Sequence, residues 1–459
     1  MSSSEKRIGL IRMKKSVDMT IGSPIKNIFW FMLPIVCNYV LQQFYSLADS
    51  TIVALALGKE AVTGVNLTGS LTFLVIGFSQ GCSGGFGVLL SQFVGAKDEN
   101  KIKKSFAVSI LLTLVIATIL TTVSLTFSRK LLVLLETNEL YINHSNAYIR
   151  TIFAGIVFTM FYNLASQVLL AFGDSKSPLV ILIISAVLNI GLNSLLFVTD
   201  MTVAWAGWAT VISQGIAALV GFIIIFKKIP VLRLKREDFS FSARFAFTHL
   251  GMGLPMAFQF SITAIGCMIQ QRAFNLFPPE YAMAQSTGSK INGIFDAGVL
   301  SAFGTAFGTY CGQNYGAKRI DRIEQGVKAG FAVGGILTLV SMAAALGICY
   351  PMSYVLLPNA TNEVYSYVFT YILINSSMYV FLMLIFFFRH ALQGTGKSMT
   401  AAFGGVVELI ARTFCAFTLA KISFQWACFS NPLAWITAGL FLMISFLIYL
   451  KKEKKTYGN

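Results

Sequence analysis

Long apolar blocks separated by short polar connections limit most strongly what this chain can fold into. A stretch of roughly 20 apolar residues is long enough to cross the hydrocarbon core of a bilayer as one helix. We place such helices at 28–56, 61–94, 105–127, 146–172, 178–198, 203–226, 246–276, 283–312, 326–349, 364–391, 399–420 and 432–450. The sequence therefore predicts an all-α polytopic membrane protein with twelve transmembrane helices.

The composition supports this class and argues against several others. Of 459 residues, 56% are hydrophobic and only 12% are charged, whereas soluble domains carry about 25% charged residues. The cysteines show no CxxC or Cys/His spacing, so neither a disulfide framework nor a resident metal site is expected. The sequence contains neither a complete phosphate-binding loop nor an HExxH motif. We therefore expect a protein that is not an enzyme, needs no cofactor and draws its energy from an ion gradient.

The distribution of Lys and Arg predicts the orientation. The net charge of +16 is concentrated in alternate connections, and short cytoplasmic segments of membrane proteins carry such an excess. The basic parts are the N-terminal stretch, the connections after the second, sixth and eighth predicted helices, and the C-terminal tail. We therefore expect a multi-pass protein of the cell inner (plasma) membrane with both termini in the cytoplasm, and no nucleic-acid partner.

An internal repeat divides the chain into two halves. The same spacing separates Pro34 from Pro255, QFVGAK from QNYGAK, and Gly173 of GDSKS from Gly394 of GTGKS. We predict a cytoplasmic segment (1–27), an N-lobe of six helices (28–226), a cytoplasmic linker (227–245), a C-lobe of six helices (246–450) and a cytoplasmic tail (451–459). Parallel repeats of this kind are typical of secondary transporters, whose substrate path lies between the repeats.

The glycines of the GAK segments have a local interpretation. Gly95 and Gly316 each follow a long apolar helix. Glycine is favoured in the left-handed conformation that ends many helices. We therefore expect these two residues to take that conformation.

Asp49 is the outstanding polar residue of the N-lobe. It lies within the first apolar block, and a carboxylate at membrane depth costs roughly 2.5–3.5 kcal/mol on insertion scales. Gln42 and Tyr45 precede it by seven and four residues and share its helical face. Pro34 lies earlier in this helix and predicts a kink, because proline removes a backbone donor.

Three further polar residues lie in the fifth and sixth predicted helices. Asn189 and Asn193 are four residues apart on one face, and Thr210 follows in the next helix. Their amides and hydroxyl are able to tune the protonation of a carboxylate or to supply oxygen ligands to Na⁺. Alternatively, they act only as hydrogen-bonding links between helices.

The C-lobe carries different polar residues. Gln270 stands at the repeat position of Asp49, and Arg272 follows two residues later. Glu408 and Arg412 are spaced for an ion pair on one helix. That pair is either a structural ion pair or a coupling or substrate site, and Arg272 is placed to extend to the outer surface. Ion coupling is therefore expected in the N-lobe.

In combination, the LP…Q..Y...D pattern of the first helix, the two GAK segments, GDSKS and the two six-helix halves resemble the multidrug and toxic compound extrusion (MATE) family. The resemblance extends from about residue 20 to residue 450. It implies an antiporter that exports cationic, often aromatic drugs and dyes while H⁺ or Na⁺ enters. One chain contains both lobes, so a monomer in the lipid bilayer is expected to function.

The resemblance also implies roles for individual residues. Asp49 resembles the family's coupling carboxylate, Asn189 and Thr210 resemble its partners, and Pro34 resembles a proline linked to bending of the first helix. Asn193 stands where many members have aspartate, which leaves one fewer carboxylate and argues against Na⁺ without excluding it, because amide oxygens also coordinate Na⁺. A transient Na⁺ at Asp49 is the only expected metal.

A second departure from the family pattern concerns the branch. Thr263 stands where members of the NorM branch have glutamate. This residue favours a bacterial DinF- or MepA-like branch.

Other functions predict different arrangements. A lipid-linked oligosaccharide flippase of the same superfamily would need Arg272, Lys290 and Arg412 to converge on an open cavity that binds pyrophosphate. A membrane enzyme would need a cluster of catalytic side chains near one membrane face, and the sequence shows none. A passive channel would leave the duplicated lobes unexplained.

Overall fold

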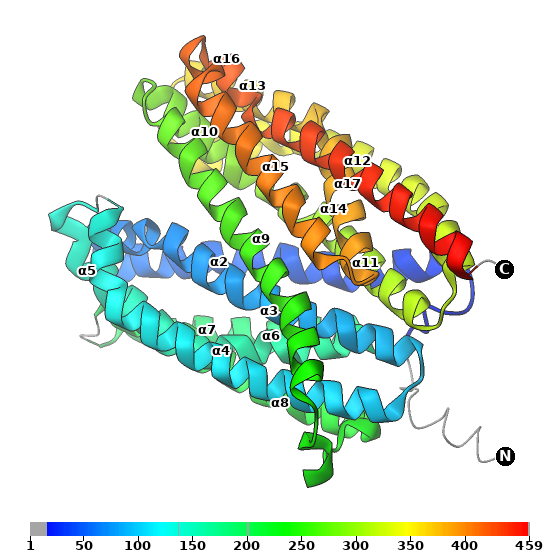
Figure 1. Ribbon diagram of the computed structural model, residues 1–459. Coiled ribbons are helices and arrows are strands. Elements are labelled where there is room, and N and C mark those ends of the chain that lie inside the picture. The colour runs from blue at the N-terminus through cyan, green and yellow to red at the C-terminus, as the bar shows by residue number, and fades with distance from the viewer. Residues whose placement is uncertain (1–15, 136, 200–201, 458–459) are drawn as a thin grey trace. The chain divides into compact units, whose positions relative to one another are not determined.

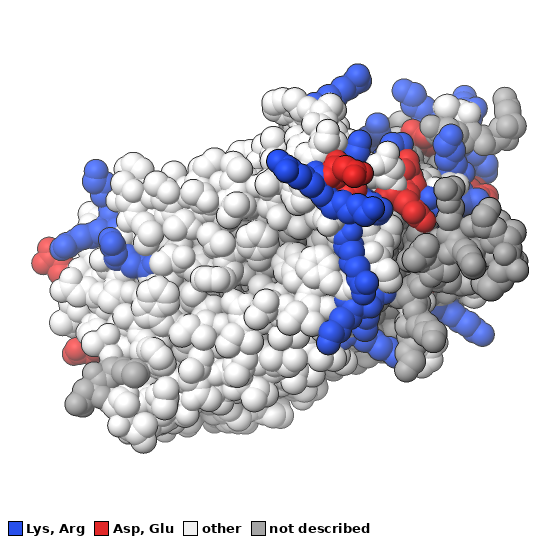
Figure 2. Space-filling view, turned by 90° about the horizontal axis from the view of Figure 1, so that it is seen from below, with Lys and Arg blue, Asp and Glu red and all other residues white. Residues whose placement is uncertain are grey.

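The computed structural model describes residues 16–135, 137–199 and 202–457 (Figure 1). Every regular element within these residues is helical, which confirms the prediction of an all-α protein. Nine described helices are long and apolar enough to cross a membrane, and two bent helix pairs raise that number to eleven. Figure 2 shows a wide surface without charged side chains, beside which Lys and Arg gather. These features confirm a polytopic membrane fold.

The chain divides into two compact units, each described here by itself. Unit 1 contains residues 16–18 and 41–261, and unit 2 contains residues 19–40 and 262–457. Two helices, α2 (Pro24–Leu67) and α9 (Ala243–Phe274), contribute one part to each unit.

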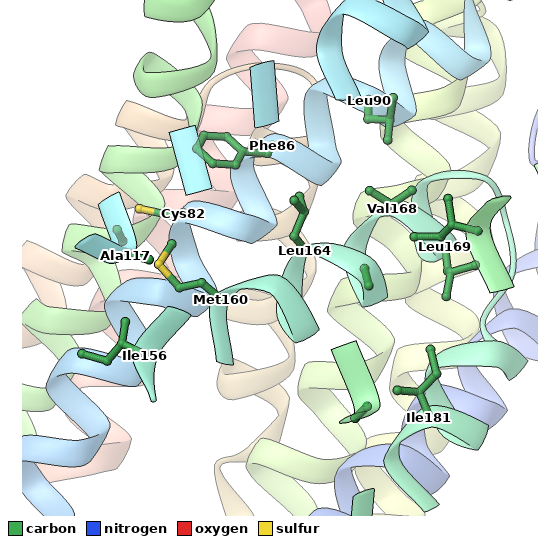
Figure 3. Close-up of a cluster of buried hydrophobic side chains, with 14 of the residues drawn as sticks. Cys82, Phe86, Leu90, Ala117, Ile156, Met160, Leu164, Val168, Leu169 and Ile181 are labelled. Carbon is green, nitrogen blue, oxygen red and sulfur yellow. The ribbon is translucent and has the colours of Figure 1, made fainter. Parts of the chain in front are cut away.

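The other elements of unit 1 lie side by side around α6 and α8 (Figure 1). They are α3 (Gly69–Gly95), α4 (Glu99–Leu134), α5 (Glu139–Ala154), α6 (Ile156–Ala171), α7 (Lys176–Asn193), α8 (Val203–Lys228) and the 3₁₀ turns η1 (Ser194–Phe197), η2 (Pro230–Leu232) and η3 (Arg236–Phe239). Buried side chains such as Phe86 and Leu90 of α3 and Leu164 and Val168 of α6 form its core (Figure 3).

Unit 2 pairs α11 with α14 and α15 with α17. Its further elements are α10 (Pro279–Gly293), the π-helical η4 (Ile294–Leu300), α11 (Ser301–Gly316), α12 (Ile320–Leu356), α13 (Asn362–Ser377), α14 (Tyr379–Gly394), α15 (Ser398–Phe417), η5 (Leu419–Lys421), α16 (Phe424–Cys428) and α17 (Ser430–Tyr457).

Several predicted spans differ from the helices. The predicted spans 146–172 and 364–391 are each two helices, bent by 51° at Gly155 and by 49° near Met378. The span 283–312 contains α10, η4 and α11 and is not among the apolar spans found in the described chain. Short π-helical segments of this kind occur inside α-helices and are frequent at functional sites.

The first two predicted helices also have different boundaries. The first predicted helix, 28–56, lies within the apolar span Pro24–Gly58, which ends where α2 is interrupted. The second predicted helix, 61–94, contains the end of α2 at Leu67 and the start of α3 at Gly69. The backbone of α2 stays helical at Pro34, and its non-helical residue is Gly58. The kink expected at Pro34 therefore stays a prediction.

The GAK turns correct another expectation. Lys97 and Lys318, with φ of 56° and 57°, take the left-handed conformation that was expected of Gly95 and Gly316. The Lys97 N–H donates to the Val94 carbonyl, and the Asp98 N–H donates to the Phe93 carbonyl. This bond pattern is the Schellman motif, with lysine at its left-handed position.

The glycine turns between α6 and α7 and between α14 and α15 place their left-handed residue differently within the two repeat segments. Gly173 and Gly396 have φ of 81° and 84°, whereas Gly394 is the last helical residue of α14. The left-handed glycine therefore stands at the first position of GDSKS and at the third position of GTGKS, and the repeat itself stays a prediction.

Replacing Gly173 with alanine should destabilise the protein by about 1–3 kcal/mol, the usual cost of a side chain in such a backbone conformation. The added Cβ would lie 2.2 Å from the Val17 carbonyl oxygen. Gly191→Ala is the matched control, because a Cβ there meets nothing within 4 Å. Thermal unfolding in detergent measures both, and a Gly173→Ala protein as stable as the control would contradict the prediction.

Candidate functional site

Asp49 lies in a polar cluster inside unit 1. Its side chain comes from α2 and is 9% exposed. Asn193 of α7 donates from Nδ2 to Asp49 Oδ1 at 2.5 Å and to Asn189 Oδ1 at 2.9 Å. Asn189 in turn donates to Thr210 Oγ1 of α8 at 3.1 Å. The structure thus brings the four predicted residues together in one hydrogen-bonded chain.

The local sequence explains how α7 contributes two amides. Asn189 and Asn193 are one helical turn apart, so their side chains leave the same face. Both are completely buried. Asn193 is also the last residue of α7, before the chain tightens into η1. Burial of two amides requires hydrogen-bonding partners, and Asp49 and Thr210 provide them.

Rotation of the Asn189 amide by half a turn gives a second set of bonds. Its oxygen then accepts from the Tyr45 hydroxyl at 3.2 Å and from Thr210, and its nitrogen donates to Asp49 Oδ1 at 3.2 Å. The two orientations change how many donors face the carboxylate. Tyr45 is therefore within reach of the cluster, as its helical spacing from Asp49 predicts.

Two neighbouring residues differ from the sequence analysis. Tyr148 of α5 is buried and close enough to Asp49 and Tyr45 to interact with them electrostatically. The sequence analysis missed Tyr148, because a tyrosine near the start of an apolar block carries no distinguishing pattern. Gln42, expected on the Asp49 face, is exposed.

The Asp49 carboxylate accepts from an amide nitrogen of Asn193, and the amide and hydroxyl oxygens of Asn189, Asn193 and Thr210 belong to the same cluster. No ion pair to Asp49 occurs within the described chain. The Asn193 Oδ1 is buried and lacks a hydrogen-bond partner among the described residues. Carboxylate, amide and hydroxyl oxygens are hard ligands that suit a small cation. Such a site is chemically able to hold a proton on Asp49 or a partly dehydrated Na⁺ beside it.

The C-lobe charges form a separate cluster inside unit 2. Glu408 accepts from Arg412 at 3.0 Å, as their spacing predicts, and from Arg389 of α14 at 2.6 Å. The three side chains are between 5% and 7% exposed. Arg389 was missed by the sequence analysis, because an arginine near a helix end looks like a topology signal.

The remaining predicted C-lobe residues are not part of this ion cluster. Gln270 is buried, and its Nε2 has no hydrogen-bond partner among the described residues. Arg272 and Lys290 are exposed, whereas Arg412 contacts Glu408 and Cys267. Arg412 is thus already paired with a carboxylate, which a free pyrophosphate-binding cation would not be.

Comparison with known proteins identifies the family. The MatE family profile matches residues 34–195 and 255–418. "Probable multidrug resistance protein YpnP" of Bacillus subtilis (strain 168) is 30% identical over 319 residues, covering 67% of this chain and 69% of that protein. "Multidrug export protein MepA" of Staphylococcus aureus (strain NCTC 8325 / PS 47) is 26% identical over 208 residues, covering 45% of this chain and 46% of that protein.

Solved structures show the same fold. The "outward-facing conformation of a multidrug resistance MATE family transporter" has a TM-score of 0.89 at 17% identity and covers 96% of this chain and 99% of its own. A MATE structure in the straight conformation has a TM-score of 0.88 at 17% identity, covering 97% of this chain and 100% of its own. The family profile, the curated relatives and the fold agree, and the chain belongs to the MATE family of multidrug efflux transporters.

Proposed function

We propose that this protein is a secondary active transporter that exports cationic and aromatic compounds in antiport with H⁺ or Na⁺. The observation that carries the proposal is the buried Asp49 carboxylate, which lies in a transmembrane helix among amides and hydroxyls. Ionisable residues in such segments mark ion pathways and proton relays. The named functions of YpnP and MepA support multidrug export.

The proposed mechanism is competition between the ion and the drug for unit 1. Asp49 that carries H⁺ or Na⁺ and empty, charged Asp49 favour different hydrogen-bond arrangements with Asn189 and Asn193. A ligand shifts a conformational equilibrium only by its difference in affinity for the two states. We propose that ion and drug bind in alternation, each favouring a different geometry of α2, in a monomer with both termini in the cytoplasm.

The flippase alternative receives less support from the charged residues. It would require an open cationic cavity, and Arg412 is instead buried in contact with Glu408. The other two cations that the flippase would need, Arg272 and Lys290, are exposed. Export of cationic compounds, which an anionic Asp49 suits, is therefore the function that we carry forward.

Ethidium efflux from energised cells lacking their own pumps tests the proposed function. We expect expression of this protein to speed efflux, and we expect one of two treatments, removal of the pH gradient or removal of Na⁺, to stop it. The treatment that stops efflux identifies the coupling ion. The same rate with both gradients removed would contradict antiport, and no transport of several cationic dyes would favour the flippase.

A further inference from the structure

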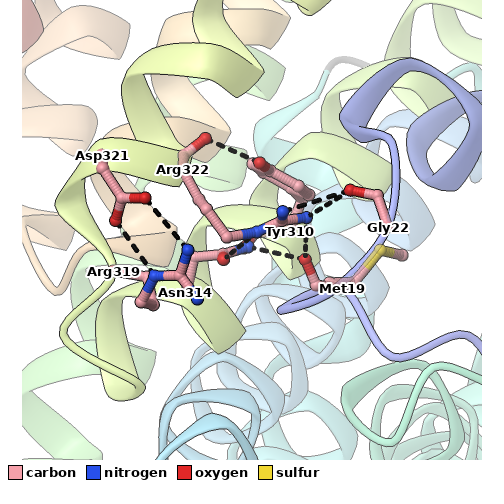
Figure 4. A network of polar contacts seen from close by, with 7 residues as sticks. All are labelled: Met19, Gly22, Tyr310, Asn314, Arg319, Asp321 and Arg322. Atoms are coloured by element: carbon pink, nitrogen blue, oxygen red, sulfur yellow. Dashed lines mark hydrogen bonds and ion pairs between the residues drawn. The ribbon is translucent and has the colours of Figure 1, made fainter.

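A buried arginine holds the chain that leads into α2. Arg322, in the first turn of α12, donates from Nη2 to the Met19 carbonyl at 3.1 Å and from Nη1 and Nη2 to the Gly22 carbonyl, each at 3.1 Å (Figure 4). Asn314 of α11 also donates to the Met19 carbonyl, at 3.0 Å. Gln313 accepts from the Met19 N–H at 3.0 Å.

The neighbouring residues fix Arg322 itself. Its Nε donates to Asn314 Oδ1 at 3.1 Å, and its own carbonyl accepts from the Tyr310 hydroxyl at 2.6 Å. Arg322 is 7% exposed. Asp321, the adjacent carboxylate, pairs with Arg319 instead (Figure 4). The Arg322 guanidinium therefore interacts with main-chain carbonyls, which its planar arrangement of N–H donors suits.

Arg322 holds this segment through main-chain carbonyls, so the attachment does not depend on the side chains of the segment. Met19 and Gly22 lie about 300 residues from Arg322 in the chain, at separations of 303 and 300. Bonds between an ionised donor and a carbonyl are stronger than neutral ones. The segment 19–22 is consequently attached to α11 and α12, and not merely adjacent to them.

The attached segment leads to the candidate coupling residue. Residues 19–40 belong to unit 2, and α2 passes into unit 1 after Val40, before it reaches Asp49. One residue before Met19 the chain belongs to unit 1, where the Val17 N–H donates to the Gly173 carbonyl at 3.0 Å. The Arg322 attachment therefore lies directly before the start of α2, and the same helix carries Asp49.

We propose that Arg322 is a positioning residue for transport. It attaches the start of α2 to unit 2, so that a conformational change of α2 near Asp49 moves the helix relative to a fixed end. This inference rests on the proposed antiport through Asp49. When the start of α2 is attached, a conformational change of α2 is transmitted to unit 2. When the start is detached, residues 19–24 move instead and unit 2 is not affected. Loss of the attachment should therefore slow turnover and leave ligand binding intact.

Arg322→Ala in proteoliposomes tests the proposal against Arg319→Ala, a neighbouring arginine that is exposed and outside the attachment. We expect the maximal ethidium transport rate of Arg322→Ala to fall about tenfold, with the dye dissociation constant in detergent changed less than about twofold, because the site in unit 1 is untouched. Arg322→Lys should restore only part of the rate, since one ammonium does not reproduce the fork. A rate equal to that of Arg319→Ala would overturn the proposal.

A cross-link separates positioning from a folding defect. With the exposed Cys37 and Cys267 replaced, a disulfide between Met19→Cys and Gln313→Cys should restore transport to Arg322→Ala, and reduction should remove it again. If the oxidised cross-link forms and transport stays low, the attachment is not what Arg322 provides, and the proposal fails.

Hydrogen exchange gives a readout that needs no transport. The amides of residues 19–23 should exchange faster in Arg322→Ala than in Arg319→Ala, and equal protection would overturn the proposal. Wild type and Asp49→Asn, measured in parallel, report on the proposed function separately. If wild type does not transport the dye, antiport fails, and hydrogen exchange alone decides whether Arg322 attaches the segment.

Discussion

Asp49→Asn should reduce gradient-driven ethidium transport by about 10- to 100-fold, the range of a typical coupling free energy between two ligands. The substitution keeps the shape of the side chain and an oxygen that accepts from Asn193 Nδ2. In the proposed mechanism, it removes the group that takes up a proton or balances the charge of Na⁺. The protein should therefore remain folded while the driving ion no longer acts on α2.

Gln42→Ala provides the matched control in the same helix. Gln42 is exposed, so its removal should leave the transport rate within about twofold, as for most surface changes. Transport is measured in proteoliposomes with equal protein content and an imposed pH or Na⁺ gradient. Wild-type rates in Asp49→Asn would show that another residue couples the ion.

Glu408→Gln should destabilise unit 2 by about 3–5 kcal/mol, the usual cost of removing one partner of a buried ion pair. Glu408 is the shared carboxylate of Arg389 and Arg412, so its neutralisation leaves two buried cations close together. Thermal unfolding in detergent should show a large decrease in melting temperature.

Two other variants make this prediction specific. Arg389→Gln leaves the Glu408–Arg412 pair intact and should destabilise less than Glu408→Gln. Asp321→Asn breaks an exposed pair with Arg319 and should cost less than about 1 kcal/mol. If Glu408→Gln were as stable as Asp321→Asn, the cluster would not hold unit 2 together.

Asp49 could be singled out because membrane burial makes a carboxylate costly, and its grouping with Asn189 and Thr210 was implied by the resemblance to the family. Asn189 and Asn193 share a face at any tilt of their helix, so helical spacing alone predicts that they lie side by side. Tyr148 and the exposure of Gln42 depend on which helices pack around α2, and a single sequence does not contain that information.

The attachment of residues 19–22 to Arg322 could not be predicted from the sequence, for a different reason. Arg322 lies in a basic connection, where the positive-inside pattern already accounts for arginine. Its partners are main-chain carbonyls, which leave no signature in the sequence. Arg389 was hidden in the same way, since only the packing of α14 against α15 brings it to Glu408.

The left-handed lysines show a limit of residue preferences. Glycine is the usual residue at the left-handed position, and the GAK segments contain a glycine two residues earlier. The bond pattern places Lys97 and Lys318 there instead. The position of the last helical hydrogen bond sets the register of the turn, and residue preference alone does not fix that position.

Ion release during dye binding tests the central claim most directly. Purified protein in detergent is titrated with ethidium, while a pH indicator and radioactive Na⁺ report on released ions. If ion and drug compete through Asp49, wild type should release about one H⁺ or Na⁺ for each bound dye, and Asp49→Asn should release none. Dye binding without ion release from wild type, or equal release from Asp49→Asn, would contradict the account.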